Sequence, residues 1–221
     1  MLYIVPSPVG NLADITLRAI EVLKSANLVL AEDTRTSSVL LNHYGINVPL
    51  SPYHQHNEHK VASHIADQIA EGKIVALLSD AGTPGISDPA FLLVKECIAR
   101  GLRVETLPGA TAFVPALISS GLPANRFVFE GFIPLKKGRQ TLLKKLAADD
   151  RTIIFYESPV RLPRTLKDLA EYFGENRRCC VSREISKKFE EHVRGTLKEV
   201  QEHFAAKPAK GEIVLMVAGN V

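Results

Sequence analysis

The chain has 221 residues, of which 46% are hydrophobic and 23% charged, with a formal net charge of +3. This composition is ordinary for a folded protein, and the length allows one large domain or two of about 100 residues each. No apolar run approaches the roughly 18 residues of a membrane-spanning helix, and the N-terminus lacks the basic segment of a secretory signal. Three Cys without metal-ligand spacing favour reduced thiols over a disulfide framework. We therefore expect a cytoplasmic protein with no membrane partner.

The charge is unevenly distributed along the chain. Residues 1–120 hold 8 Lys and Arg against 11 Asp and Glu, a net of −3, whereas residues 121–221 hold 19 against 13, a net of +6. A basic half favours contact with a polyanion such as nucleic acid, because Lys and Arg supply the attraction to phosphate. The alternative is a basic surface that only keeps the protein soluble.

The first half alternates short apolar segments with segments of helical periodicity. Strands are predicted at 2–5, 28–31, 49–53, 74–78 and 104–107. Helices are predicted between them at 15–25, 37–44, 58–71 and 91–100. This alternation predicts a parallel sheet with right-handed crossovers.

A linker-like stretch at 119–126 separates this pattern from a second one. Strands are then predicted at 126–130, 152–156, 178–183, 189–193 and 212–217, and helices at 141–146, 159–172 and 197–204. The connection at 184–188 is short enough to turn one strand back on the next, so this sheet should be mixed. We predict two α/β domains, 1–118 and 122–221, with a ligand cleft between them.

Four polar loops directly follow predicted strands of the first domain. They are Pro6 to Asn11, Ala31 to Thr36, Ser79 to Pro89 and Leu107 to Ala112. Carboxyl ends of parallel strands share one edge of a sheet, where ligands bind in open α/β folds. In the third loop, Asp88 before Pro89 is interpreted as a helix N-cap with Pro at the first helical position. The chain lacks the Gly-x-Gly-x-x-Gly, P-loop and Gly-x-Ser-x-Gly patterns, which argues against dinucleotide binding, P-loop nucleotidases and ordinary α/β hydrolases.

The same loops carry a resemblance to a known family. The motifs are Pro8-x-Gly10-Asn11-Leu12, Ala31-Glu32-Asp33-Thr34-Arg35, Ser79-Asp80-Ala81-Gly82-Thr83-Pro84 and Pro108-Gly109-Ala110-Thr111, followed by Phe155-Tyr156-Glu157-Ser158-Pro159-x-Arg161, Arg194-Gly195-Thr196-Leu197 and Lys210-Gly211-Glu212. From Leu2 to about Val217 the chain resembles the tetrapyrrole methylase superfamily (class III methyltransferases). Within it, the chain is similar to the branch that methylates the ribose of a cytidine in small-subunit (16S) ribosomal RNA.

That resemblance implies an N-terminal parallel sheet, a C-terminal mixed sheet, a homodimer, and S-adenosylmethionine bound between the domains. The implied cofactor residues are Ser7, Pro8, Asp80, Gly82, Thr83, Pro84, Ile86, Thr111 and Ala112 in the first domain, and Tyr156, Glu157, Arg183 and Glu212 in the second. Ser7 and Thr83 depart from the Thr and the acidic residue that many relatives have there. Many relatives also continue into a C-terminal helical extension, so we expect RNA contacts from the core or the partner subunit.

A ribose hydroxyl is a poor nucleophile while protonated, so a base or a cation should stand near it. Asp33 is a candidate base and Arg35 a candidate phosphate contact, although the two could simply pair with each other. Glu157 is a second candidate, with capping of the following helix as the alternative. The run from His54 to His59 is interpreted as a polar loop that faces the substrate, with His54 or His56 as a candidate base; a zinc site and solvated histidines are the alternatives.

The basic second half offers candidate contacts to an RNA backbone. They are Lys136, Lys137, Arg139, Arg161, Lys187 and Lys188, with a solvated helix face as the alternative. The predicted partner is ribosomal RNA, free or in an assembled small subunit. Two other functions stay open: a small-molecule methylase of the tetrapyrrole type, and a non-catalytic RNA-binding assembly factor that keeps the fold.

Overall fold

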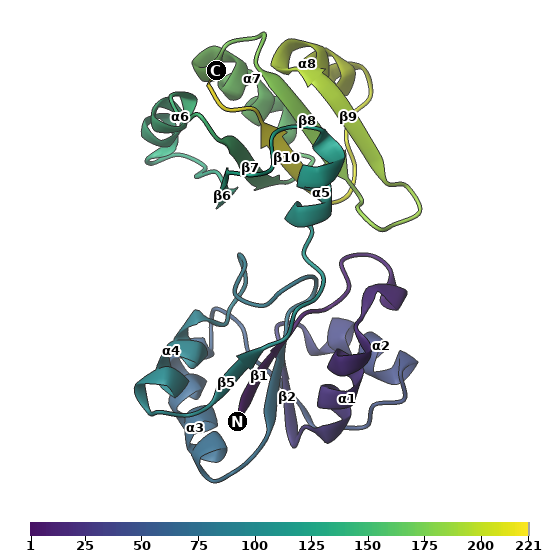
Figure 1. Ribbon diagram of the computed structural model, residues 1–221, viewed down its shortest axis with the longest axis vertical. Helices are drawn as coiled ribbons and strands as arrows, with labels where there is room; N and C mark the ends of the chain where they lie inside the picture. The colour runs from purple at the N-terminus through teal and green to yellow at the C-terminus, as the bar shows by residue number, and fades with distance from the viewer. Residues whose placement is uncertain (221) are drawn as a thin grey trace. The chain divides into compact units, whose positions relative to one another are not determined.

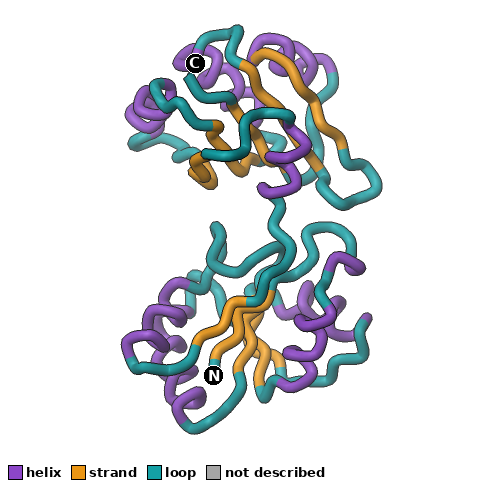
Figure 2. The backbone as a smooth tube through the Cα atoms, in the orientation of Figure 1, coloured by secondary structure: helices purple, strands orange, loops and turns teal. Residues whose placement is uncertain are grey.

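The structure, a computed structural model, describes residues 1–220. It consists of two compact units, Met1–Thr111 and a second unit that begins at Ala112. Each unit has its own five-stranded sheet with helices packed on it (Figures 1 and 2). The α/β fold class, with a parallel first sheet and a mixed second sheet, is confirmed. No helix among the described residues is long and apolar enough to span a membrane.

The first sheet is parallel throughout and has the strand order β3-β2-β4-β1-β5. Its strands are β1 (Leu2–Val5), β2 (Leu28–Ala31), β3 (Leu50–Pro52), β4 (Val75–Leu78) and β5 (Val104–Thr106). The central strands are apolar on both faces because helices cover both sides. All five carboxyl ends lie at the same edge, so the loops that follow the strands share that edge.

Two helices pack on each face of this sheet (Figure 1). The helices α1 (Leu17–Ser25) and α2 (Thr34–His43) cover one face, and α3 (Glu58–Ala70) and α4 (Phe91–Ala99) cover the other. Helix α1 begins after Thr16, whose hydroxyl accepts a hydrogen bond from the main chain of Ala19 at 3.0 Å. A short 3-10 turn, η1 (Leu12–Asp14), precedes it.

One helix start and one helix cap in this unit differ from the sequence prediction. Helix α2 begins at Thr34 rather than at 37, because the Asp33 side chain accepts the main-chain N–H of Arg35 and caps the helix. Helix α4 begins at Phe91, and its N-cap is Ala90, which makes no side-chain cap bond. The prediction that Asp88 caps this helix is therefore wrong, and its carboxylate stands before the helix.

The second sheet has the order β6-β7-β10-β8-β9. Its strands are β6 (Phe127–Phe132), β7 (Thr152–Glu157), β8 (Arg178–Arg183), β9 (Glu191–Thr196) and β10 (Ile213–Val217). Strands β6 and β7 are parallel, whereas β10 is antiparallel to β7 and β8, and β8 is antiparallel to β9. The helices α6 (Arg139–Ala147), α7 (Leu162–Phe173) and α8 (Leu197–Ala206) share one apolar core with Phe155, Val181 and Leu215 of the sheet.

One helix has no counterpart in the prediction. Helix α5 (Phe113–Ser120) lies against β8, β9 and β10, and Figure 1 shows it in front of the second sheet. The Arg194 guanidinium on β9 donates to the Ser119 carbonyl at 2.8 Å, and the helix ends at Gly121, whose φ is 72°. Pro115 and the lack of a side-chain N-cap hide the helix in the sequence. The two units meet between Thr111 and Ala112, so α5 belongs to the second unit. The sequence prediction placed residues up to 118 in the first domain.

Candidate functional site

The first and third loops are joined at the carboxyl edge of the first sheet. The main chains of Ser7 and Gly82 exchange two hydrogen bonds, at 2.8 and 2.9 Å. The buried Ser7 hydroxyl donates to the Ser79 carbonyl at 2.8 Å, and the Ser79 hydroxyl lies 3.0 Å from the Gly82 carbonyl. The Ser7 side chain thus ties the first loop to the third, while the Ser79 hydroxyl braces the third loop internally; the sequence suggested only two separate motifs.

The fourth loop joins the same assembly. The Thr83 hydroxyl donates to the Ala110 carbonyl at 3.0 Å. Gly109 packs so closely on the first loop that a Cβ placed on it would lie 2.7 Å from Cβ of Pro6. Gly82 has a φ of 79°, a conformation that favours glycine and leaves its main chain open to a close approach. These loops therefore form one connected surface of main-chain groups at the sheet edge.

The second loop carries the Asp33–Arg35 pair. The two side chains form a bidentate ion pair, with Arg35 Nε 3.0 Å from Oδ1 and Nη2 2.6 Å from Oδ2 of Asp33. Hydrogen bonds from the Arg35 side chain and main chain lower the pKa of Asp33 to about 2. A carboxylate with so low a pKa is a weak proton acceptor near neutral pH. The Arg35 side chain is 89% exposed, so its guanidinium still faces solvent.

Three carboxyl groups, Glu32, Asp80 and Asp88, gather at this edge. Asp80 accepts the main-chain N–H of Asp33 at 3.1 Å, which links the second and third loops. Burial, followed by the charges of Glu32 and Asp80, raises the pKa of Asp88 to about 7. Burial and the charge of Asp80 also raise the pKa of Glu32. Such raised values result from partial burial and like charges, so these carboxyl groups hold their protons to a higher pH than exposed ones.

Neither Glu32 nor Asp88 is a predicted site residue: Glu32 belongs to the motif from Ala31 to Arg35, and Asp88 was predicted to cap a helix. Acidic residues directly after β2 and β4, which are neighbours in the sheet, were the signal available in the sequence. Their mutual proximity depends on the strand order, which the sequence does not show.

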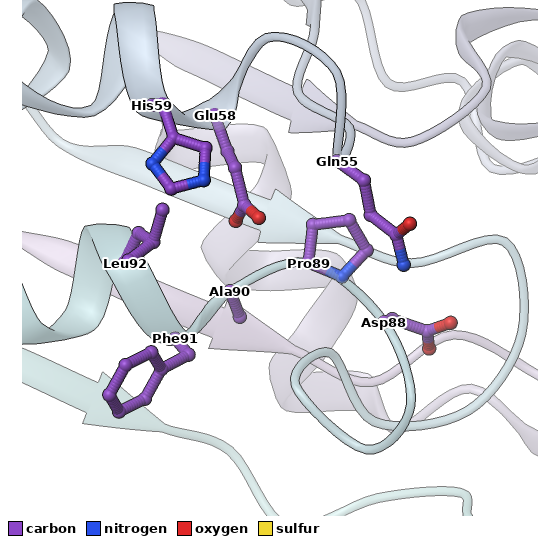
Figure 3. A pocket seen from close by; sticks show the side chains of 8 residues that line it. All are labelled: Gln55, Glu58, His59, Asp88, Pro89, Ala90, Phe91 and Leu92. Carbon is purple, nitrogen blue, oxygen red and sulfur yellow. The ribbon is translucent and has the colours of Figure 1, made fainter. Parts of the chain in front are cut away.

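Asp88 also lines a pocket of about 410 Å³ between the start of α3 and the loop before α4. The lining residues are Gln55, Glu58, His59, Asp88, Pro89, Ala90, Phe91 and Leu92. In Figure 3, Gln55 and Asp88 lie on the side of the pocket opposite His59 and Leu92, and the Glu58 carboxylate points toward Ala90. A ligand in this pocket would contact the carboxylates of Glu58 and Asp88 and the apolar side chains beside them.

The histidine run lies beside the same edge. The main-chain N–H of His54 donates to the Asn57 side chain at 2.9 Å, while its ring Nδ1 is buried with no partner among the described residues. The rings of His54 and His56 are 5.9 Å apart in an edge-on arrangement. Among residues 1–220, no group of three His, Cys, Asp or Glu side chains is arranged to hold a metal ion. His54 stays a predicted base with one ring nitrogen unengaged.

The four predicted cofactor residues of the second unit converge on one edge of its sheet. Strand pairing places Ile213 opposite both Glu157 and Arg183, so Tyr156 and Glu212 lie beside the same edge. Arg183 pairs with Glu191 at 2.6 Å, and Glu212 pairs with Lys187 at 2.8 Å. Both side chains therefore have an ionic partner within this unit.

Glu157 belongs to a buried polar network between β7 and α7. Its carboxylate accepts the Thr165 hydroxyl at 2.6 Å and the main-chain N–H of Ser158 at 2.8 Å, and it pairs with Arg161 at 3.1 Å. The carboxylate has no exposed surface. Glu157 is therefore better explained as a residue that stabilises the start of α7 than as a base that contacts the substrate.

Arg139 belongs to the same network rather than to an exposed basic surface. It is 4% exposed and donates to Asp168 at 2.7 Å, to the Thr165 hydroxyl at 3.0 Å and to the Pro134 carbonyl at 3.2 Å. Arg161 is partly buried and donates to the Ile133 carbonyl. Both guanidiniums were predicted to bind RNA; the structure corrects this for Arg139, whose donors point into the protein.

The remaining basic candidates differ in how they are paired. Lys136 and Lys137 are exposed, and neither forms an ion pair within the part of the chain that the structure describes. Lys187 contacts both Glu184 and Glu212, at 3.0 and 2.8 Å. Lys188 lies over the ring of Phe189, 5.6 Å from its centroid. Lys136 and Lys137 therefore offer the more available charge for a polyanion.

Known proteins are similar to this chain over nearly its whole length. A family model described as Tetrapyrrole (Corrin/Porphyrin) Methylases matches residues 1–201. The Ribosomal RNA small subunit methyltransferase I of Synechocystis sp. is 47% identical over 99% of this chain and 79% of its own length. The protein of the same name from Thermotoga maritima is 45% identical over 99% of this chain and 98% of its own length.

Solved structures share the fold at lower identity. The methyltransferase CobJ has a TM-score of 0.74 at 22% identity, covering 99% of this chain and 93% of its own. Diphthine synthase has a TM-score of 0.77 at 13% identity, covering 98% and 89%. A uroporphyrin-III C-methyltransferase from Thermus thermophilus, complexed with S-adenyl homocysteine, has a TM-score of 0.68 at 21% identity, covering 98% and 96%.

Proposed function

The chain belongs to the tetrapyrrole (corrin/porphyrin) methylase family, and we propose that it transfers a methyl group from S-adenosylmethionine to the RNA of the small ribosomal subunit. The observation that carries this proposal is the identity of 45 to 47% with proteins named Ribosomal RNA small subunit methyltransferase I, over 99% of the chain. The connected loops of the first unit support it, because they fall within the matched residues. The methyl acceptor proposed is the ribose 2′-hydroxyl of a cytidine, as the motif resemblance implies.

The residues at the edge of the first sheet fit the cofactor chemically. Main-chain groups of Gly82, Thr83 and Thr111 lie on the connected loops, where a nucleoside can approach the backbone. The nearby carboxylates can accept hydrogen bonds from ribose hydroxyls and offset the positive charge of a sulfonium. When bound, the cofactor supplies an electrophilic methyl carbon. Two further groups complete the proposed set: Ser7, Pro8, Asp80, Pro84 and Ile86 of the first unit, and Ala112, Tyr156, Glu157, Arg183 and Glu212 of the second unit.

The residue best suited to take the proton of the ribose hydroxyl is Asp88. It lies near the end of the third loop and lines the adjacent pocket, so a substrate group can reach it. Its pKa of about 7 matches a general base that works near neutral pH, whereas the pKa of Asp33, about 2, does not. Asp33 instead holds Arg35, whose exposed guanidinium can contact a phosphate.

RNA attraction is proposed to come mainly from Lys136 and Lys137, with Lys187 and Lys188 as weaker contributors because they already have partners. Backbone contacts of this kind position RNA without reading its sequence. A homodimer and a location in the cytoplasm, where ribosomes are methylated, complete the proposal. Light scattering of the purified protein tests whether it forms a homodimer.

The test is transfer of labelled methyl from S-adenosylmethionine to small subunits that lack the modification, followed by nucleoside mass spectrometry. Formation of 2′-O-methylcytidine supports the proposal. Methylation of another nucleoside would overturn the choice of acceptor, and a methylated porphyrinoid product would favour the small-molecule reaction. RNA binding with no transfer and no cofactor binding would favour a non-catalytic assembly factor.

Single-turnover rates of two variants then test the base. Asp88→Asn should slow transfer by about 10²- to 10⁴-fold, the usual contribution of a general base, with cofactor affinity kept. Asp33→Asn is the matched control, and it should slow transfer far less if the protein stays folded. If Asp33→Asn slows methyl transfer more than Asp88→Asn does, Asp33 rather than Asp88 is the general base.

A further inference from the structure

An aromatic surface runs along β6, at the edge of the second sheet. Strand pairing places Phe127 opposite Thr152 and Phe129 opposite Ile154. An irregularity between Phe129 and Gly131 then shifts the register, so that Phe132 lies opposite Tyr156. Gly131 takes a φ of 62° at this point. Because side chains alternate along a strand, this bulge turns Phe132 to the face of Phe127 and Phe129.

These rings form a continuous series on the face of the sheet opposite α6, α7 and α8. We call it the β6 aromatic strip: Phe127, Phe129, Phe132, Tyr156 and Phe113 at the start of α5. Successive centroids are 6.0 Å apart for Phe127 and Phe113, 4.8 Å for Phe113 and Phe129, 5.1 Å for Phe129 and Tyr156, and 5.8 Å for Tyr156 and Phe132.

Both ends of the β6 aromatic strip are open to solvent. Phe127 is 40% exposed and Phe132 is 53% exposed. Packing in the core does not explain Phe127 and Phe132, because the core of this unit lies on the other face of the sheet and consists largely of Leu, Ile and Val. Exposed aromatic rings in a row are costly to leave in water and usually mark a binding surface.

Positive charge follows directly from the strip. The chain leaves β6 at Phe132 and reaches Lys136 and Lys137 within five residues. Both lysines are exposed, and neither has an ionic partner among residues 1–220. Open aromatic rings beside unpaired lysines match single-stranded nucleic acid, whose bases stack on the rings while its phosphates meet the cations. A protein partner would not need both features.

We propose that the β6 aromatic strip binds unpaired bases of the RNA substrate by stacking, with Phe132 and Phe127 as the stacking residues and Lys136 and Lys137 as phosphate contacts. This inference rests on the proposed function, because it names the surface that holds the RNA. It predicts a preference for single-stranded over duplex RNA, since paired bases present no face to a ring.

The test measures binding of a short unstructured oligoribonucleotide and of an RNA duplex by anisotropy. Phe132→Ala should weaken binding of the single strand by roughly 5- to 150-fold, the range found for loss of one stacked base. Phe132→Tyr, which keeps a ring, should restore most of the affinity, whereas Phe132→Leu should not. Ile98→Ala is the matched control, because Ile98 is 65% exposed near the end of α4 in the first unit and lies outside the strip.

A second readout follows stacking directly. The chain contains no Trp, so Phe132→Trp introduces a single indole on the strip. Its fluorescence should be quenched by the single strand and not by the duplex. Ile98→Trp should show no such quenching at the same concentrations.

Other results would overturn the inference. Unchanged RNA affinity for Phe132→Ala, or an equal loss for Ile98→Ala, would remove the strip as a stacking surface. Loss of dimer in light scattering would make the strip an interface between two copies, and loss of cofactor affinity in calorimetry would assign it to the cofactor. If wild-type protein methylates ribosomal RNA while these variants bind it normally, only this inference fails. If the variants lose RNA binding but wild type transfers no methyl group, only the proposed function fails.

Discussion

Replacing Asp88 with Asn tests the electrostatics of the candidate site through the free energy of unfolding. Folding raises the pKa of this carboxyl from 3.8 to about 7, through burial and the charges of Glu32 and Asp80. A raised carboxyl pKa favours the folded state while the group is protonated. That contribution is complete below the unfolded-state pKa and is lost as pH rises through about 7. Asn carries no charge, so the variant should not show this loss.

The size of the effect follows from the two pKa values. Between about pH 5 and pH 8 the wild type should lose roughly 2.6 kcal/mol relative to the variant, at about 1.4 kcal/mol per pH unit. Because Asp88 is only partly buried, solvent screening reduces this, and we expect about half, ~1.3 kcal/mol. The stability difference between Asp88→Asn and wild type should therefore move in favour of the variant as pH rises.

Urea unfolding of both proteins at the two pH values measures this difference. Asp33→Asn is the control, because the pKa of Asp33 is lowered by folding and its contribution is lost only in acid, as pH falls toward about 2. That variant should be less stable than wild type by a similar amount at both pH values. A stability difference for Asp88→Asn that does not change with pH would refute the reasoning.

Three further predictions concern the remaining parts of the structure. Changing Lys136 and Lys137 together to Glu should weaken RNA binding and lower the slope of log K against log salt by about 1.4, since each phosphate contact on a single strand contributes about 0.7; an unchanged slope in a salt titration would contradict this. Gly109→Ala places a Cβ 2.7 Å from Pro6, so it should destabilise the protein by about 1–3 kcal/mol and weaken cofactor binding in calorimetry; wild-type values for both would argue against the connected loops. Arg139→Met removes a buried guanidinium that donates to Asp168, Thr165 and the Pro134 carbonyl, and it leaves the partly exposed Asp168 with the longer Arg164 contact at 3.8 Å. It should cost about 1–3 kcal/mol in urea unfolding, with the salt dependence of RNA binding unchanged; a lower salt slope would instead place this residue on the RNA surface.

Local chemistry in the sequence was enough to predict most elements of the fold. Alternating apolar and amphipathic segments predicted every strand of both sheets, and the parallel first sheet followed from their order. Helix α5 was missed because its apolar residues and Pro115 lack the caps and periodicity that mark a helix. The four loops were predicted to share one edge, since strands that alternate with helices end on the same side.

The roles of individual side chains were decided only in three dimensions. The sequence left two interpretations for Asp33 and Arg35, a catalytic pair or a mutual ion pair. The bidentate contact between them, together with the capping of α2 by Asp33, favours the ion pair. Arg139 belongs to a basic run in the sequence, but it lies on the buried face of α6 and meets Asp168 of another helix. Such outcomes depend on partners that are distant in the chain, so no local pattern contains them.

The sequence by itself therefore determined the family motifs, the succession of strands and helices along the chain apart from α5, and the presence of polar groups at the strand ends. Tertiary structure decided that Asp88 stands near Glu32 and Asp80, because the strand order makes β2 and β4 neighbours. It also decided that Phe132 joins the aromatic face, because one bulge shifts the register of β6. The physical reason is the same in both cases: pKa values and exposed faces depend on distances through space, and these are set by how strands pair.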